Sequence, residues 1–314
     1  KSQWKHWLGL HVVQSLYHER RKRRRESFLK AYKYVIIIAR QKSLRNEKEN
    51  TMRLNKFLSE AGLCSRREAD RLVEAGRVTV NGKPASSGMQ VEDSDQVCLD
   101  GNQVKPQERK VLLLFYKPKG IECTANLQVK KNVISYIQYP IRVYYAGRLD
   151  KDSEGLLLLT NQGDLVNEIM KAGNFHEKEY LVTVDRPVTE EFLQKIRTGV
   201  PVLGTITRPC AAEKRGEYEF QVVLTQGLNR QIRRMCSYLG YEVKKLKRTR
   251  IMNLTLGSLK AGEYREASKA EVQELKRQIE EEKTVGRKEV YRGGKPVKNP
   301  GKYRNPEKKF RKKQ

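Results

Sequence analysis

Apolar residues recur with the spacing of helices or strands only in the middle of the chain, and the first such stretch is residues 52–110. It opens with apolar residues three and four positions apart and continues with an alternating run that ends at Asn81-Gly82. The first spacing predicts an amphipathic helix, and Asn-Gly after an alternating run predicts a β-hairpin. Ser65 and Glu68 have the spacing of a capping box, which predicts a second helix. We therefore expect a small domain of helices and a hairpin, with a polar linker at residues 101–110.

The second patterned stretch, residues 111–282, predicts a larger domain that contains both strands and helices. Residues 111–116 and 156–159 are continuous apolar runs, which are typical of buried strands. Residues 178–184 alternate between apolar and polar side chains, and this period of two predicts a half-buried strand. Helical stripes of apolar residues lie at 165–170, 232–239 and 272–279.

Capping residues predict where these three helices begin. Asp164 and Asn229 are expected to cap the first two, because each precedes an apolar stripe and carries a side-chain oxygen. The third helix opens with a second capping box, formed by Ser268 and Glu271.

A short polar loop comes directly before the apolar run 156–159. Its sequence, Gly147-Arg148-Leu149-Asp150-Lys151-Asp152-Ser153-Glu154-Gly155, places an arginine close to two aspartates. A carboxylate held beside an arginine stays ionised and can act as a nucleophile or a base. Taken by itself, the loop is explained at least as well by a turn whose charges are solvated. The chemical interpretation therefore depends on what the rest of the chain supplies.

Positive charge is concentrated at the two ends of the 314-residue chain, whose formal net charge is +28. Residues 1–51 hold 14 basic and 4 acidic residues, and residues 283–314 hold 13 basic and 2 acidic residues. Such arms are typical of disordered tails that bind polyanions, and RNA or DNA is the expected partner. Residues 1–51 begin with Lys1 and show no sustained periodicity, so we expect Met52 to be the native start and the arm to be a non-native or disordered basic extension.

The cysteine pattern and the apolar runs indicate in which cellular compartment the protein works. Five cysteines are scattered without a Cys-x-x-Cys pair, and their odd number argues against a disulfide framework. A reducing cytoplasm is therefore expected. The longest apolar run of the first arm, residues 35–39, is far too short to cross a bilayer, and no zinc-ligand spacing is present.

Basic side chains gather at several places in the two patterned stretches and are candidates for contact with RNA phosphates. The candidates are Arg66, Arg67, Arg71, Lys83, Lys117, Arg230, Lys244 and Lys245. The last two begin a basic strand, residues 244–250, which includes Arg248 and which we expect to run along RNA phosphates. The ordinary alternative, a set of solvated basic faces, stays open at this point.

Residues 52–83 resemble an S4 RNA-binding domain. The resemblance rests on Arg-Leu-Asn-Lys-Phe-Leu-Ser, then Ser-Arg-Arg-Glu-Ala-Asp, then Val-Thr-Val-Asn-Gly-Lys. S4 modules recognise RNA shape and phosphates, which suits an arginine-rich helix face with few aromatic side chains. The resemblance implies an S4-like domain and linker over residues 52–110.

Residues 111–282 resemble the catalytic domain of the RsuA/RluB/RluE/RluF family of ribosomal RNA pseudouridine synthases. Four motifs carry the resemblance: Lys117-Pro118-Lys119-Gly120, the loop 147–155, the strand 178–184 and the segment 226–235. The wording His-Glu-Lys-Glu-Tyr-Leu-Val-Thr-Val is most similar to the RluF branch. The implied fold class is α+β, with a mixed, largely antiparallel sheet and a cleft across its middle.

The same resemblance implies a reaction and assigns residues to it. Uridine becomes pseudouridine when the bond from the ribose to N1 breaks, the uracil turns, and a carbon–carbon bond forms to C5. Asp150 would be the catalytic aspartate, by attack on the ribose, attack on the base or removal of a proton. Tyr180 would pack against the uracil, Ile232 would line the pocket, and Arg233 would hold Asp150. Arg148 would fill the space left by the extruded base or bind a phosphate.

The implied partner is ribosomal RNA, most similar to the large-subunit (23S) substrates of the family. No metal, no small-molecule cofactor and no membrane is expected to take part, and we expect a monomer. The enzyme would occupy residues 111–282, and residues 283–314 would form a basic disordered tail.

Two other functions are alternatives to this one. The pair Asp150 and Asp152 resembles the paired carboxylates of a glycosidase, but the arginine-rich surroundings suit a polyanion better, and we expect Asp152 to order the loop. A non-catalytic S4-type RNA-binding or ribosome-assembly factor is the second alternative. Such a protein would not need Asp150, Tyr180 and Arg233 together.

Overall fold

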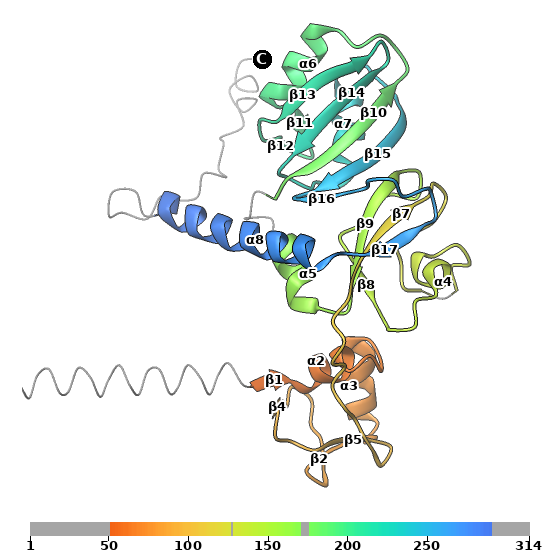
Figure 1. Cartoon of the computed structure of the whole chain (residues 1–314), viewed down its shortest axis with the longest axis vertical. Helices are drawn as coiled ribbons and strands as arrows, with labels where there is room; N and C mark the ends of the chain where they lie inside the picture. The colour runs from red at the N-terminus through yellow and green to blue at the C-terminus, as the bar shows by residue number, and fades with distance from the viewer. Residues whose placement is uncertain (1–50, 127, 171–175, 291–314) are drawn as a thin grey trace, which may run out of the picture. The chain divides into compact units, whose positions relative to one another are not determined.

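The computed structural model describes residues 51–126, 128–170 and 176–290, with side chains up to residue 281. These residues form two compact units that divide between Pro106 and Gln107 (Figure 1). The predicted basic arm, residues 1–50, and most of the predicted basic tail, residues 291–314, lie outside the described residues. Within the described part of the chain, no helix is both long enough and apolar enough to cross a membrane.

The first unit packs helices against short antiparallel strands. Its elements are β1 (Thr51–Arg53), α2 (Leu54–Glu60), α3 (Arg66–Glu74), β2 (Val78–Val80), β3 (Lys83–Pro84), β4 (Gln90–Glu92), β5 (Val97–Leu99) and β6 (Asn102–Gln103). Ser65 Oγ accepts a hydrogen bond of 3.2 Å from the Glu68 amide, which confirms the predicted N-cap. The Glu68 side chain accepts from Arg71 at 3.1 Å instead of reaching back to the cap. Asn81 and Gly82 have φ values of 52° and 76°, and they join β2 to β3 as the predicted hairpin turn.

The expected linker at residues 101–110 is wrong in its first part. Asn102–Gln103 form β6, which pairs with β5, and Val104 is buried in the core of this unit. The apolar side chain of Val104 gains more from this core than from solvent, so the first unit continues to Pro106.

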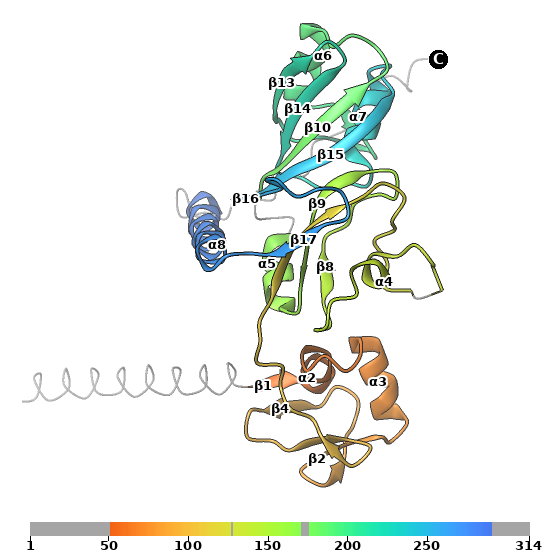
Figure 2. The same cartoon turned by 45° about the vertical axis from the view of Figure 1, so that its right-hand side comes forward.

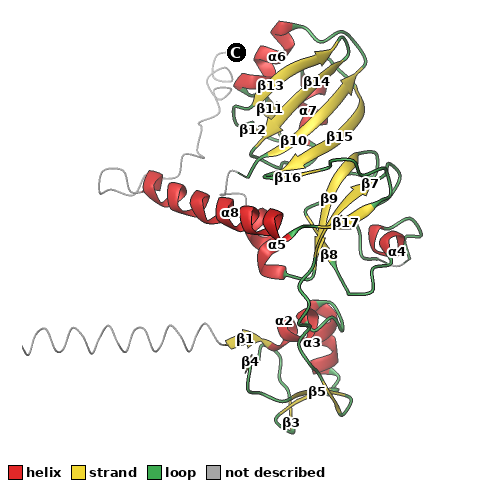
Figure 3. Ribbon diagram, in the orientation of Figure 1, coloured by secondary structure: helices red, strands yellow, loops and turns green. Residues whose placement is uncertain are grey.

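The second unit is built on a mixed sheet. Its strands are β7 (Leu112–Lys117), β8 (Tyr144–Ala146), β9 (Glu154–Thr160), β10 (Lys178–Val184), β11 (Pro201–Val202), β12 (Thr205–Ile206), β13 (Ala211–Gly216), β14 (Glu219–Leu224), β15 (Val243–Ile251), β16 (Leu254–Thr255) and β17 (Tyr264–Glu266). Its helices are α4 (Val133–Ile137), α5 (Gly163–Met170), α6 (Glu190–Thr198), α7 (Gln231–Tyr238) and α8 (Lys269–Val290) (Figure 3). The main sheet has the order β13-β14-β10-β15-β9-β7-β17, with β16 on β15 and β8 on β9.

The strand directions confirm the expected α+β class with a mixed, largely antiparallel sheet. Among the described strands of this sheet, β9 and β15 run parallel, and the other pairs run antiparallel. The strands predicted at 111–116, 156–159 and 178–184 appear as β7, β9 and β10.

Separate apolar cores lie on the two sides of the β9–β15 junction. Strands β10, β13, β14 and β15 share one core with α6 and α7, centred on Phe192 and Phe220. Strand β9 lies between α5 and α4 (Figure 2). It is buried on both faces: Leu156 and Leu158 pack with α5 and α8, whereas Leu157 and Leu159 pack with α4. Burial on both faces explains why the sequence of β9 is continuously apolar.

The β9–β15 junction requires a glycine. Gly155 lies opposite Arg248 in the parallel register and has a φ of 105°. A Cβ added at Gly155 would lie 2.3 Å from the carbonyl oxygen and 2.6 Å from the nitrogen of Arg248. A side chain is excluded at this position for two reasons. The positive φ disfavours any residue with a Cβ, and the Arg248 backbone, which cannot move away within the sheet, occupies the space the Cβ would need.

Some predicted helix ends differ from the structure. Helix α5 begins at Gly163, so Asp164 lies inside its first turn instead of capping it. Helix α7 begins at Gln231, and the residue at its N-cap is Arg230 in the left-handed conformation, not Asn229. The Asn229 side chain accepts a hydrogen bond of 3.4 Å from Arg234 instead. Helix α8 opens with the predicted capping box and continues to Val290, beyond residue 282, where the catalytic domain was expected to end.

Replacing Gly155 by alanine should destabilise the second unit by roughly 2–5 kcal/mol, because strain at a positive φ adds to a clash with backbone atoms. Chemical denaturation followed by circular dichroism measures this change. Gly240→Ala is the matched control, since Gly240 has a φ of 79° and nothing within 4 Å of the added Cβ. The control should lose about 1 kcal/mol. Equal losses in the two variants would contradict a steric requirement at the junction.

Candidate active site

A pocket of about 470 Å³ opens in the second unit beside the β9–β15 junction. Residues from several distant segments of the sequence line it. Five of the predicted site residues are among them: Arg148, Asp150, Tyr180, Arg230 and Ile232. They come from the loop before β9, from β10, from the residue before α7 and from α7 itself.

The loop that carries Asp150 is held by backbone hydrogen bonds. The Ser153 amide donates to the Asp150 carbonyl at 3.1 Å, and the Gly120 amide donates to the Lys151 carbonyl at 2.7 Å. The Asp150 side chain is 32% exposed, so a ligand in the pocket can reach its carboxylate. Arg230 provides the cation nearest to it, with 3.5 Å between Arg230 Nη1 and Asp150 Oδ2.

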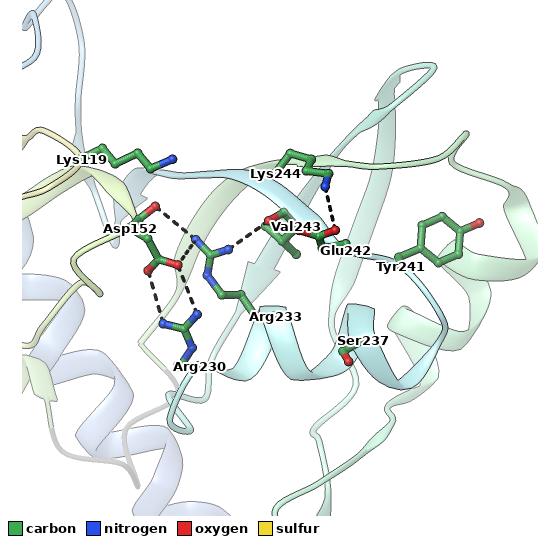
Figure 4. Close-up of a pocket in the computed structure, with 9 residues that line it drawn as sticks. All are labelled: Lys119, Asp152, Arg230, Arg233, Ser237, Tyr241, Glu242, Val243 and Lys244. Atoms are coloured by element: carbon green, nitrogen blue, oxygen red, sulfur yellow. Dashed lines mark hydrogen bonds and ion pairs between the residues drawn. The ribbon is translucent and has the colours of Figure 1, made fainter.

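Arg233 does not contact Asp150, which corrects the predicted ion pair. Its Nη2 lies 3.2 Å from Asp152 Oδ2 and donates to the Ser153 hydroxyl at 3.3 Å, and its Nη1 donates to the Val243 carbonyl at 3.1 Å (Figure 4). The reason is the position of Arg233 inside α7, where its largely buried guanidinium is fixed between the loop and β15.

Asp152 binds both arginines and thereby connects them. Arg230 donates to its two carboxylate oxygens at 3.3 and 3.2 Å, and Arg233 approaches from α7 (Figure 4). Partial burial would raise the pKa of Asp152, but the hydrogen bonds from Arg230 and the charges of both arginines outweigh it and lower that pKa below its ordinary value. Asp152 therefore holds Arg230 where it also meets Asp150, and its role in ordering the loop stays a prediction.

Lys117 is not available to RNA, which corrects its assignment as an RNA-binding residue. Its side chain is fully buried, and its Nζ donates to the Ser153 carbonyl at 2.7 Å and to the Pro118 carbonyl at 2.9 Å. Burial lowers the pKa of Lys117 below its ordinary value, although nearby acidic groups such as Asp152 and Asp150 oppose the shift. Lys117 thus links the end of β7 to the loop through hydrogen bonds made inside the protein.

The remaining basic candidates fall into two groups. Arg66, Arg67, Arg71 and Lys83 are exposed on the first unit, and Lys244 and Lys245 are exposed on β15, so their contact with RNA stays a prediction. Arg248 was expected along RNA phosphates, but its side chain is 3% exposed and lines the pocket.

A second pocket of about 550 Å³ adjoins the first in the same unit. Lys119, Arg233 and Lys244 line it together with Asp152 (Figure 4). Arg230 lines both pockets, whereas Asp150 lines the first and Asp152 the second. The two aspartates of the loop therefore face different spaces.

Sequence reasoning missed the structural role of Lys117 and the position of Arg248. The burial of Lys117 could have been predicted, because Lys117 directly continues the apolar run of β7. The burial of Arg248 could not have been predicted, because the sequence does not distinguish Arg248 from the other basic residues of β15.

Comparisons with known proteins identify the family. Residues 111–238 match the family model described as RNA pseudouridylate synthase, and residues 52–107 match that of the S4 domain. The dual-specificity RNA pseudouridine synthase RluF of Escherichia coli K12 is 46% identical over 280 residues, covering 82% of this chain and 97% of the relative. The ribosomal large subunit pseudouridine synthase B of Bacillus subtilis 168 is 36% identical over 233 residues, covering 71% of this chain and 95% of the relative. A crystal structure of a pseudouridylate synthase, 29% identical, aligns with a TM-score of 0.53 over 71% of this chain and 99% of its own.

The fold and the pocket therefore define an RNA-modifying enzyme with an S4 domain before its catalytic domain. The chain belongs to the RNA pseudouridine synthase family, as its sequence motifs indicated.

Replacing Lys117 by methionine should cost about 1–3 kcal/mol of stability, because two carbonyl groups lose a charged donor. The folded pKa of Lys117 lies below its ordinary value of 10.5, so the unfolded chain holds the proton more tightly than the folded one. Wild-type stability relative to Lys117→Met should therefore rise with pH between the lowered pKa and 10.5. Denaturation of both proteins across this range measures the difference, and a difference independent of pH would contradict the buried charge.

Proposed function

We propose that Asp150 is the catalytic aspartate of this pseudouridine synthase and that its substrate is a uridine of 23S ribosomal RNA. The observation that carries the assignment is the separation of the two loop aspartates. Asp150 lines the pocket that also contains Tyr180 and Ile232, whereas Asp152 is engaged by two arginines in the neighbouring space.

The pocket has the chemistry of a site for an extruded nucleobase. Leu228, Ile232 and Leu246 contribute apolar surface, and the half-buried ring of Tyr180 offers a face against which a pyrimidine can pack. A base inside a duplex cannot reach such a pocket without leaving its stack, which costs a few kcal/mol and favours unpaired uridines.

Arginines at the pocket suit the backbone of that nucleotide. Arg148 and Arg230 are exposed there, so either can meet a phosphate next to the extruded uridine. Arg148 can also occupy the space that the base leaves in the RNA. In the free protein Arg230 Nη1 also lies 3.5 Å from Asp150 Oδ2.

The reaction is an isomerisation and needs no group from outside the substrate. The bond between C1′ and N1 breaks, a bond between C1′ and C5 forms, and the proton of C5 is finally replaced by one on N1. A partly exposed carboxylate in this place supports attack on the ribose, attack on the base, or removal of a proton. In each case a neutral amide could not substitute for it.

The choice of 23S RNA as substrate and of the cytoplasm as location is supported by observations outside the pocket. The relative from Bacillus subtilis is named for the large ribosomal subunit, which favours 23S RNA for this chain as well. The five cysteines are free in the described structure, which suits a reducing cytoplasm. Membership of an enzyme family sets aside the non-catalytic alternative.

Asp150→Asn should lower the single-turnover rate on ribosomal RNA by on the order of 10⁴-fold or more. Its affinity for RNA should be largely kept, because the change removes one charge from a strongly basic protein. Asp152→Asn is the matched control, and it should slow the reaction far less, because Asp150 stays in place while Arg230 loses one of its anchors. Turnover by Asp150→Asn at the rate of Asp152→Asn would remove Asp150 from its role.

Pseudouridine mapping in cells with and without the gene tests the substrate assignment. One or more pseudouridines of 23S RNA should disappear without the gene and return with it. Loss confined to small-subunit RNA or transfer RNA would overturn the 23S assignment without touching the role of Asp150.

A further inference from the structure

Arg248 is a buried charge in the wall of the pocket. It stands on β15, directly opposite Tyr180 of β10 and opposite Gly155 of β9. Directly opposed residues of antiparallel strands project to the same face, so Arg248 and Tyr180 point to the same side of the sheet. Both line the pocket that contains Asp150, and the Arg248 side chain is 3% exposed.

The hydrogen bonds of this guanidinium are incomplete within the described residues. Its Nε donates to the Leu156 carbonyl at 2.7 Å, which fixes the plane of the group. Its Nη2 is buried and has no hydrogen-bond partner among the described residues. A buried charged donor without an acceptor is costly, and such costs are found where a ligand supplies the missing acceptor.

The surroundings restrict what that acceptor is. Apolar side chains and the ring of Tyr180 form much of the wall around Arg248, as suits the flat face of a base. A phosphate would lose its bound water if it paired with the buried guanidinium of Arg248. It keeps that water at the exposed arginines, Arg148 and Arg230, which are therefore better phosphate partners. An oxygen atom of the base itself is therefore the acceptor that fits.

We propose that Arg248 is a substrate-contacting residue that donates a hydrogen bond to a carbonyl oxygen of the target uracil. This role rests on the proposed function of the pocket. The contact holds the ring in register with Asp150 while the bond to N1 is broken and the base turns. If the acceptor is O4, the same donor also rejects cytosine, which carries an amino group at that position.

The test compares full-length wild type with Arg248→Met and Arg248→Lys. The substrate is an RNA fragment that carries the mapped uridine. Loss of the donor should lower kcat/KM by roughly 10- to 150-fold, the range for one hydrogen bond from a charged group. Arg248→Lys keeps the charge but not the planar fork, and it should recover part of this loss. Arg277→Met is the matched control, because it removes the same charge from helix α8, where Arg277 is engaged by Glu274 and Glu281 and lines neither pocket.

Modified RNAs identify the acceptor. The fragment is made with 2-thiouridine or 4-thiouridine at the target, or with a phosphorothioate next to it. Sulfur accepts hydrogen bonds weakly, so one of the thio-bases should slow wild type by roughly tenfold and slow Arg248→Met no further. Coupling of this kind to a base position supports the proposal, and coupling to the phosphorothioate instead overturns it.

Other results would contradict the role of Arg248 or the proposed function. An unchanged kcat/KM in both Arg248 variants, or a loss of thermal stability with an unchanged single-turnover rate, would show that Arg248 is only structural. If Arg248→Met does not fold, Arg248→Lys with the thio-bases gives the same comparison. Failure of wild type on every ribosomal RNA would refute the proposed function itself, whereas wild-type turnover with unaltered variants refutes only the role of Arg248.

Discussion

The register between β9 and β15 is the constraint on which the catalytic unit depends. Two antiparallel halves of the sheet meet at this parallel pair, and the backbones approach so closely at Gly155 that no Cβ fits. The loop with Asp150 leads directly into β9, so the register sets the position of Asp150 against Tyr180 on β10. A shift by one residue would turn every side chain of β9 to the opposite face. The pocket is therefore determined by backbone geometry before any side chain in it makes a contact.

Charge compensation then determines which polar groups are available to a ligand. Asp152 is occupied by two arginines, and Lys117 is occupied by two carbonyl groups beneath the loop. Asp150 has a longer contact of 3.5 Å to Arg230 and stays partly exposed, and Arg248 keeps a buried donor free of partners within the described structure. A rigid surround in which Asp150 is the one described carboxylate that lines the pocket suits chemistry on an extruded base, since the charges need no rearrangement at the moment of reaction.

Sequence patterns predicted the elements well wherever contiguous residues decide the outcome. The N-cap at Ser65, the capping box at Ser268 and the turn at Asn81-Gly82 are confirmed, because their hydrogen bonds and dihedral angles involve residues a few positions apart. The predictions failed where a tertiary core took over. Val104 was expected in a linker and lies in the core of the first unit, and the chain before α7 places Arg230 at the cap instead of Asn229.

The sequence by itself determined strands β7, β9 and β10 and helices α5, α7 and α8, the α+β class through the family motifs, and five of the residues that line the pocket. These follow from periodicity, caps and short motifs, which are properties of neighbouring residues. Tertiary structure decided that Arg230 meets Asp150 while Arg233 meets Asp152, and that Lys117 and Arg248 are buried. The arginine partners of Asp152 lie 78 and 81 residues away along the chain. Their pairing depends on distances of a few ångströms between packed segments, and residue type carries no information about those distances.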